Sequence, residues 1–243
     1  MCTVGLILQQ HPTYPLIVAA NRDESTDRPS LAPLRWTDQP IPFVGGRDVI
    51  AGGTWMGFSD AGVLIALTNL WVGDFRKKRP RSRGAVVSAL LAAGTLDEAA
   101  ARLSTISTTD RGPFNLICAD TTGRAFTACS ADGLAPRWLS PGCHAVSNLA
   151  PGTPWAKTDA VRSGLSRWHE ADDLTAHLTA VLATHIGRRD PQHSVCVHTP
   201  MSYGTVSSTI LLTGGTAPSV LRYCGGPPCV TPMRDCSALL PSA

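Results

Sequence analysis

The chain begins Met1-Cys2-Thr3-Val4-Gly5-Leu6-Ile7-Leu8-Gln9, and after a turn with Pro12 and Pro15 it continues Leu16-Ile17-Val18-Ala19-Ala20. Two short apolar runs separated by proline-containing turn residues predict a β-hairpin. In an antiparallel pair, the end of the second strand lies beside the start of the first. We therefore expect the polar cluster Asn21-Arg22-Asp23-Glu24, which follows the second run, to lie next to Cys2.

Cys2 is a candidate nucleophile because of its place in the chain. If Met1 is removed, one residue carries both a thiol and a free α-amine. An α-amine titrates near pH 8, so it can take the thiol proton directly or through one water molecule. The alternative is that Cys2 is simply the second residue of an intracellular protein.

Composition excludes several classes of protein. A net charge of +3 over 243 residues is too small to indicate nucleic acid as the main partner. No apolar stretch approaches the roughly 20 residues that span a bilayer, and the N-terminus lacks the pattern of a signal peptide. The eight cysteines do not follow the pattern of a small disulfide-rich secreted fold. We expect a cytoplasmic protein with no membrane span, and the sequence does not indicate its oligomeric state.

The order of the predicted elements indicates the fold class. Strands come in runs, and pairs of helices separate the runs instead of alternating with single strands. This order favours antiparallel sheets with helices on their outer faces, an α+β fold. Residues 1–243 are expected to form a single domain, with a tail rich in Pro, Gly and Cys from about residue 225. Helices are expected at 82–93, 95–106, 154–168 and 172–185, a surface loop at 25–42, and late strands at 194–198, 207–213 and 220–224.

Two asparagines end strand-like segments and could serve acyl transfer. Asn69 ends Ala66-Leu67-Thr68-Asn69, and Asn148 follows Ser147 at the end of a later run. Either side-chain amide could donate to an oxyanion, although asparagine at a strand end is also a common turn former. Arg22 or Asp23 could orient the α-amine or stabilise the thiolate; alternatively, the two form an exposed ion pair that contributes little.

Other motifs give weaker indications. The basic run at 76–81 could hold phosphate, but it lacks interleaved aromatic residues and favours a solvated loop. His169, His177 and His185 recur at eight-residue spacing on predicted helices. They could ligate a metal or haem iron, but this spacing drifts round the helix and suits solvent-facing positions better. Cys224, Cys229 and Cys236 lie in the tail without a C-x-x-C pair, and there is no C-x-x-C-H haem motif. A zinc site at these three cysteines is a weak alternative. The sequence therefore predicts no metal site and no required cofactor.

Taken together, ordered blocks of the sequence resemble the NRDE family, also called the TANGO2 family. The blocks are Met1–Thr3, Asn21–Glu24 with Arg28-Pro29, Gly45–Asp48, Ala51–Gly57, Ala66–Asn69, Ser82–Gly84, Phe114–Leu116, Ser147-Asn148 and Thr153–Lys157. The resemblance implies an N-terminal-nucleophile hydrolase-like fold, a four-layer αββα sandwich of two antiparallel sheets. Cysteine enzymes of that fold, such as penicillin V acylases and bile salt hydrolases, cleave amides through an acyl-thioester.

The resemblance also implies roles for individual residues. Arg22 and Asp23 would assist Cys2, with Asn21 and Glu24 as alternatives for that role. Asn69 would contribute to the oxyanion hole and Asn148 would touch the site from a later loop. We expect the substrate to contact Asn21, Glu24, Trp55 and Trp71.

One position departs from the family pattern. Family members tend to carry Gly-Thr-Arg before a late strand, where this chain has Gly204-Thr205-Val206. The acylases use a late arginine near their nucleophile, so either the hydrolysis or the usual substrate charge is expected to differ here.

Three hypotheses follow. The first is a cysteine amidohydrolase or acyltransferase that acts on an amide, ester or thioester of a small molecule through an acyl-Cys2 intermediate, without metal or cofactor. The second is a non-catalytic haem-binding or haem-trafficking protein, as the eukaryotic relatives suggest, in which Cys2 or a histidine would ligate iron. The third is a structural or interaction module.

Overall fold

The computed structural model describes residues 2–74, 77, 79–187 and 193–241. In these ranges the chain forms two antiparallel sheets, one of six strands in the order β10-β1-β2-β11-β12-β13 and one of seven in the order β3 to β9. The strands of the first sheet are β1 (Cys2–Leu8), β2 (Leu16–Ser25), β10 (Gly142–Val146), β11 (Tyr203–Thr213), β12 (Val220–Cys224) and β13 (Arg234–Asp235). Those of the second are β3 (Ser30–Trp36), β4 (Phe43–Asp48), β5 (Met56–Ser59), β6 (Val63–Asn69), β7 (Phe114–Asp120), β8 (Ala125–Cys129) and β9 (Arg137–Trp138).

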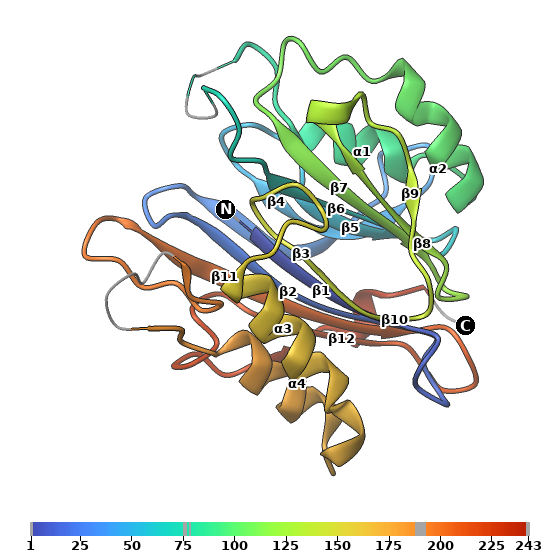
Figure 1. The fold of residues 1–243 in the computed structure, drawn as a ribbon. Coiled ribbons are helices and arrows are strands. Elements are labelled where there is room, and N and C mark those ends of the chain that lie inside the picture. The colour runs from blue at the N-terminus through green and yellow to red at the C-terminus, as the bar shows by residue number, and fades with distance from the viewer. Residues whose placement is uncertain (1, 75–76, 78, 188–192, 242–243) are drawn as a thin grey trace.

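The helices cover the outer faces of the two sheets, as the order of elements predicted, and the result is the four-layer αββα sandwich that the family resemblance implied (Figure 1). Helices α1 (Gly84–Leu91) and α2 (Leu96–Arg102) lie on the second sheet, and α3 (Ala156–Ser166) and α4 (Leu174–Leu182) lie on the first. None of the helices in the described ranges is long and apolar enough to cross a bilayer.

The apolar runs of the sequence build three buried clusters, because each sheet is covered on both faces. Alternate residues of β1 illustrate this: Val4, Leu6 and Leu8 pack between the sheets, while Ile7 packs against the helices. Gly5 faces α3, and a Cβ there would meet side-chain atoms of Leu165 and Val161 at 2.8 Å. A glycine at this position therefore allows α3 to lie close against β1.

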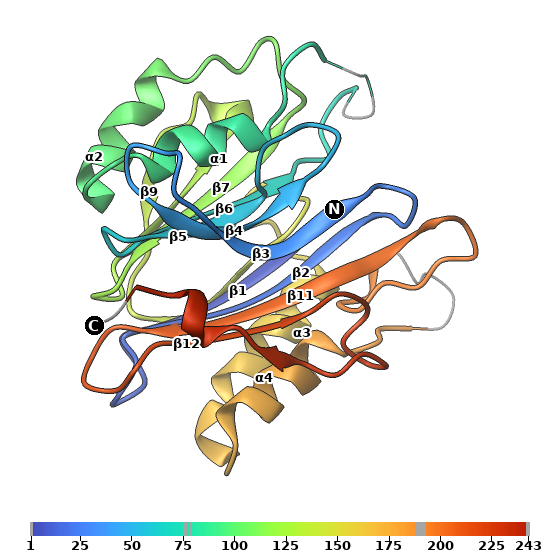
Figure 2. The same cartoon turned by 180° about the vertical axis from the view of Figure 1, so that it is seen from behind.

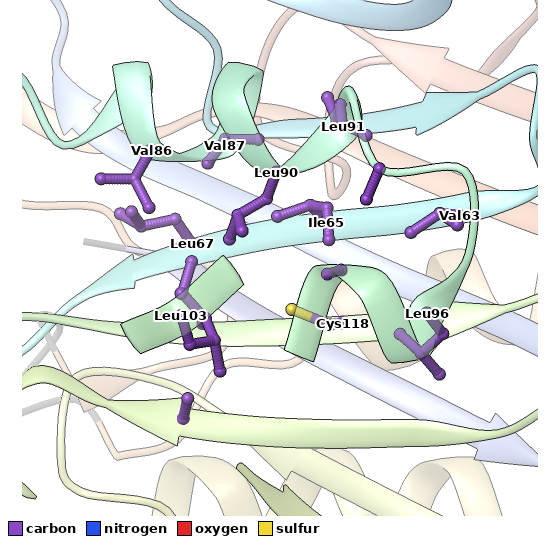
Figure 3. Packing of buried hydrophobic residues seen from close by; sticks show 14 of the residues in the cluster. Val63, Ile65, Leu67, Val86, Val87, Leu90, Leu91, Leu96, Leu103 and Cys118 are labelled. Atoms are coloured by element: carbon purple, nitrogen blue, oxygen red, sulfur yellow. The ribbon is translucent and has the colours of Figure 1, made fainter. Parts of the chain in front are cut away.

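One buried cluster lies between the second sheet and the helices that cover it, and the apolar face of α1 forms part of it. Val86, Val87, Leu90 and Leu91 of α1 pack on Ile65 and Leu67 of β6 (Figure 3). Helix α2 begins as predicted, because Thr95 caps it by accepting a hydrogen bond from the Glu98 backbone N–H at 3.1 Å. Leu96 then packs into the same cluster.

Two predictions for local structure were wrong. The proline-rich segment 25–42 is not a plain loop, since it contains β3, an edge strand with an irregular register around Pro33. Proline is tolerated at such an edge because the missing N–H need not pair. Residues 194–198 form no strand beyond an isolated bridge between His198 and Gly204.

The C-terminal segment packs against the body of the fold. After β12 the chain makes the short strand β13 and a helical turn at Ser237–Leu239, which Figure 2 shows in red beside β12. Cys236, Leu239 and Leu240 contact the cluster between the sheets.

Candidate active site

Cys2 opens into a cleft at one end of the sandwich. It pairs directly with Arg22 across β1 and β2, so the two side chains share the face between the sheets. The cleft has a volume of about 720 Å³. Its lining residues come from β1, β2, the β4–β5 connection, the end of β6 and the segment before α1: Cys2, Arg22, Glu24, Arg28, Asp48, Ile50, Ala51, Gly53, Thr54, Trp55, Leu67, Asn69, Lys77, Arg79, Pro80, Arg81, Ser82, Arg83, Gly84 and Gly112.

Arg22 is held beside Cys2 by contacts with three residues. Its guanidinium carbon lies 4.3 Å from the ring centroid of Trp55, one Nη donates to Ser30 Oγ at 3.1 Å, and the other lies 3.6 Å from Asp48 Oδ2. Burial acts to raise the pKa of Asp48, but hydrogen bonds from Arg28 and from the Ala51 backbone N–H outweigh it and leave that pKa below its ordinary value. Asp48 is therefore an ionised anchor that fixes the Arg22 guanidinium.

Asp23 lies on the opposite face of β2, behind the cleft. It forms an ion pair with Lys157 of α3 at 2.9 Å, and both side chains are fully buried. Thr205 Oγ1 also donates to Asp23 Oδ1 at 2.7 Å, and the Tyr203 hydroxyl donates to the Asp23 backbone oxygen at 3.0 Å. The structure thus places Asp23 next to the strand end that carries Cys2, but outside the set of cleft-lining residues.

Asn21 shares the helix-facing side with Asp23, and its side chain is used within the fold. Its amide donates to the backbone oxygens of Leu182 and Val195, both at 2.9 Å, and its oxygen accepts from Ser208 Oγ. These contacts attach the end of α4 and the segment around residue 195 to β2. Asn21 is therefore a structural residue in this geometry.

Asn69 and Asn148 have different positions. Asn69 ends β6 and lines the cleft with Cys2; within the described part of the chain its side-chain amide has no hydrogen-bond partner. Asn148 is buried, and its amide donates to the Asn69 backbone oxygen at 2.8 Å. The oxyanion donor suggested by the sequence is thus available at Asn69, while Asn148 fixes the position of Asn69.

Ser147 ties this arrangement to Cys2. Its hydroxyl donates to the Cys2 backbone oxygen at 2.9 Å and lies 3.1 Å from Thr3 Oγ1. Asn115 donates to the backbone oxygens of Ser147 and Leu149 at 3.0 and 2.9 Å. The loop at 147–149 therefore joins β1 to the ends of β6 and β7.

The rim of the cleft carries mainly positive charge. Six of its lining residues are cationic, and two, Glu24 and Asp48, are acidic. The cationic residues are Arg22, Arg28, Lys77, Arg79, Arg81 and Arg83. Of the basic run noted in the sequence, Arg76 and Lys78 lie outside the described residues.

Arg83 has no ion pair with a carboxylate among the described residues. It lies at the N-terminus of α1, and in the described chain its side chain makes one long hydrogen bond, 3.4 Å, to the Pro113 backbone oxygen. Burial lowers the pKa of its guanidinium, while nearby Glu24 and Cys2 act against that shift. The side chain is therefore partly desolvated close to Cys2, at a helix end where the backbone dipole favours an anion.

The loop before β5 brings α1 to the cleft. A Cβ on Gly84 would lie 2.9 Å from the Thr54 backbone oxygen, so only glycine permits this approach. The contact places Arg83 and Trp55 at the same cleft.

The remaining predicted residues separate into two groups. Glu24 and Trp55 line the cleft, whereas Trp71 does not; its ring packs against Trp155 with the centroids 5.6 Å apart.

Val206 lies at a bulge between β11 and β2, where the register shifts between Thr205 and Ser207. It lines a separate depression next to Tyr223, so the cleft obtains its positive charge from other positions.

Burial raises the pKa of the Cys2 thiol, and the positive charge of the chain's N-terminal amine acts against this rise. The carboxylates of Asp23 and Glu24 raise that pKa further, while Arg22 lowers it. The thiol is therefore protonated at neutral pH. A nucleophilic role requires a base that removes the proton during attack.

Sequence reasoning assigned no individual role to Lys157, Ser147 or Arg83. Lys157 had a detectable signal, because it occupies the buried stripe of α3 together with Val161, Gly164 and Leu165. A lysine in an otherwise apolar helix face indicates a buried partner. Ser147 and Arg83 had no comparable signal apart from their place in the ordered blocks.

The two layered sheets, with a cysteine at the start of β1 facing the gap between them, define an N-terminal-nucleophile hydrolase-like fold. Solved structures agree. A bile acid hydrolase from Clostridium perfringens, crystallised as its C2A mutant, has a TM-score of 0.62 at 12% identity, covering 98% of this chain and 93% of its own. The Caenorhabditis elegans ortholog of N-acylethanolamine-hydrolyzing acid amidase has a TM-score of 0.60 at 14% identity, covering 87% and 92%.

The sequence comparisons identify the family. The model of the family described as Transport and Golgi organisation 2 matches residues 1–219, and the chain belongs to that family. The Bos taurus Transport and Golgi organization protein 2 homolog is 30% identical over 249 residues, covering 87% of this chain and 88% of its own. The Mus musculus homolog is 34% identical over 170 residues, covering 65% and 60%.

Proposed function

We propose that the protein is a cysteine amidohydrolase or acyltransferase that forms an acyl-thioester on Cys2 after Met1 has been removed. The observation that supports this most strongly is the meeting of Cys2, Arg22 and the Asn69 amide in one cleft. Each comes from a different strand. Hydrogen bonds from Ser147 and Asn148 hold the backbone oxygens of Cys2 and Asn69. The Arg22 side chain is held by Trp55 and Ser30. An acyl-transfer site requires such a nucleophile, a nearby base and a donor for the oxyanion.

The proposed reaction has two stages, acylation of Cys2 and then deacylation. Cys2 Sγ attacks the carbonyl carbon while its own α-amine takes the thiol proton. The carbonyl oxygen becomes an oxyanion that accepts a hydrogen bond from Asn69. The tetrahedral intermediate then breaks its bond to the leaving group, which takes the proton from the α-ammonium. Water or an amine acceptor attacks the thioester next, and the Cys2 thiol is regenerated.

Asp23 and Lys157 would act as positioning residues. Asp23 sits where β2 passes the start of β1, and its charge is close enough to influence the Cys2 thiol. The pair with Lys157 would hold this strand end at a fixed distance from the loop containing Ser147. In this proposal the substrate touches neither residue.

The charge of the cleft supports an anionic small molecule as the substrate. A volume of about 720 Å³ is within the range of small-molecule sites. Cations outnumber carboxylates in the lining, and Arg83 lacks a carboxylate partner among the described residues. We therefore propose that a carboxylate or phosphate group of the substrate binds beside Arg83. The acyl carbon would then lie toward Cys2.

A matched pair of chromogenic thioesters, one with a terminal carboxylate and one with a neutral amide in its place, tests both parts of the proposal. We expect turnover of the carboxylate compound to disappear in Cys2→Ala and to survive in Cys143→Ser, which alters a thiol outside the cleft. Arg83→Gln should raise KM for the charged compound about tenfold, and leave the neutral one nearly unchanged. Full turnover by Cys2→Ala would exclude the mechanism, and equal KM changes for both compounds would exclude the charge assignment.

The free thiols suit the cytoplasmic location that we propose. All eight cysteines, each within the described ranges, are unpaired.

Haem binding is the alternative hypothesis, and the geometry of the cleft does not favour it over catalysis. A haem titration distinguishes the two. A saturable Soret shift that disappears in Cys2→Ala, together with no thioester turnover, would favour haem binding instead.

A further inference from the structure

Two histidines and two cysteines converge at a second place, outside the Cys2 cleft. These are His185, Cys196, His198 and Cys229, whose ligand atoms all lie within 4.8 Å of one another. Three of the separations are individually defined. Cys196 Sγ lies 3.5 Å from His198 Nε2, Cys229 Sγ lies 3.2 Å from the same nitrogen, and the two sulfurs are 3.7 Å apart.

These distances fit a tetrahedral metal. With Zn–S near 2.3 Å and Zn–N near 2.0 Å, ligand atoms at the corners of a tetrahedron lie about 3.3–3.8 Å apart. The measured values fall within or close to this range. The fourth group, His185, has its ring centroid 5.2 Å from that of His198, a separation compatible with two imidazoles on one ion. A set of two sulfur and two nitrogen ligands is typical of zinc.

The four ligands come from three separate segments that the fold holds together. His185 lies just beyond the end of α4, and the Cys196 backbone N–H donates to the Thr184 backbone oxygen at 2.9 Å. The bridge between His198 and Gly204 fixes the next part of this segment against the start of β11. Cys229 lies in the turn after Pro227 that follows β12.

A disulfide explains this arrangement less well. Cys196 and Cys229 are free thiols in the structure, and a bond between them would leave the two imidazoles without a role. The contacts of His198 Nε2 are with the two sulfurs, so the nitrogen points at the centre of the group.

We propose that these four residues bind a structural zinc ion. Four protein ligands complete the coordination, as in structural zinc sites that hold no open position for a substrate. The sequence predicted no metal site and offered zinc only as a weak alternative at Cys224, Cys229 and Cys236, because the chain there lacks a C-x-x-C pair. Of those three cysteines, Cys229 alone belongs to this group. The family model ends at residue 219, so Cys229 lies beyond the matched region.

The zinc site would attach the C-terminal segment to the body of the fold near Asp23. The Val197 backbone N–H donates to Thr205 Oγ1 at 2.8 Å, and that hydroxyl donates to Asp23 Oδ1 at 2.7 Å. A zinc ion bound by Cys196 and His198, on either side of Val197, would thus stabilise the hydrogen bonds that hold Asp23 behind Cys2. It would take no part in the chemistry of the cleft.

Metal analysis of the purified full chain tests the proposal. After incubation with zinc under reducing conditions and removal of excess metal, we expect about one zinc ion per chain. His185→Ala and Cys229→Ser change exposed residues and should fold, but should bind zinc more than about 100-fold more weakly, since loss of an outer partner alone costs up to that much. Cobalt substitution should give the visible absorption of a tetrahedral thiolate site in the wild type only.

His169→Ala and Cys236→Ser are the matched controls, because they remove a histidine and a cysteine outside the group. Both should retain the metal and the cobalt spectrum. Absence of stoichiometric metal in the wild type would overturn the proposal. So would a Cys196–Cys229 disulfide under the same conditions, or zinc binding unchanged in His185→Ala.

Discussion

Replacing Lys157 with methionine should destabilise the protein strongly, because the change removes one partner of a buried ion pair. Lys157 Nζ lies 2.9 Å from Asp23 Oδ2, and neither side chain is exposed to solvent. Methionine fills a similar volume, so the main effect is the loss of the ammonium partner of a buried carboxylate. Breaking such a pair costs about 3–5 kcal/mol.

The remaining contacts of Asp23 place the expected loss at the lower end of that range. Thr205 Oγ1 still donates to Asp23 Oδ1 at 2.7 Å and partly solvates the charge. We therefore expect the free energy of unfolding to fall by about 3 kcal/mol, which corresponds to a Tm lower by about 6–12 °C for a chain of this length. Urea unfolding followed by tryptophan fluorescence measures the first quantity, and calorimetry the second.

Two variants make this prediction specific. Arg162→Met, on the same helix, breaks the exposed pair with Asp159 and should cost less than about 0.5 kcal/mol. The double variant Asp23→Asn with Lys157→Met removes both charges and should recover most of the stability. If Lys157→Met behaves like Arg162→Met, or if the double variant is as unstable as the single one, the loss does not come from a buried charge and the reasoning is wrong.

Three other predictions concern the cleft. Asn69→Ala should lower kcat about 100-fold to 1,000-fold with little change in KM, because the oxyanion loses a donor; a steady-state kcat within about threefold of the wild type would contradict the assignment. Burial raises the pKa of Cys2 above the ordinary 9.0, so thiolate is scarce at neutral pH. Alkylation of Cys2 in a chain that retains Met1, followed by mass spectrometry, should therefore still accelerate above about pH 9, and a plateau below pH 8 would refute this. Gly84→Ala should lower the Tm, because its Cβ would meet the Thr54 backbone oxygen at 2.9 Å; a higher Tm, as helix propensity alone predicts, would show that the backbone relaxes there.

The sequence predicted those parts of the fold that depend on local pattern. The two apolar runs predicted a hairpin that brings the cluster at 21–24 beside Cys2, and in the structure Cys2 pairs with Arg22. The capping pattern at Thr95 marked the start of α2. By contrast, β3 was missed because the prolines and polar residues of segment 25–42 as a whole have the composition of a loop. The strand within it forms at the edge of the sheet, where Pro33 is tolerated.

The candidate site was predictable up to the point where distant segments meet. Strand alternation indicates that Arg22 and Asp23 face opposite sides, but the sequence does not show which side carries the cleft. The hydrogen bond from Asn148 to the Asn69 backbone and the pair between Lys157 and Asp23 join residues far apart in the chain. Such contacts follow from the packing of layers, which no local pattern encodes.

The central claim, that Cys2 is an N-terminal nucleophile, is tested most directly by intact mass before and after exposure to an acyl thioester. We predict that the isolated protein lacks the mass of Met1 and gains one acyl group, located on Cys2 by peptide mapping. Cys2→Ala should gain none, and Cys143→Ser should gain one like the wild type. A protein that turns over the thioester while retaining Met1, or that becomes acylated equally as Cys2→Ala, would contradict the account.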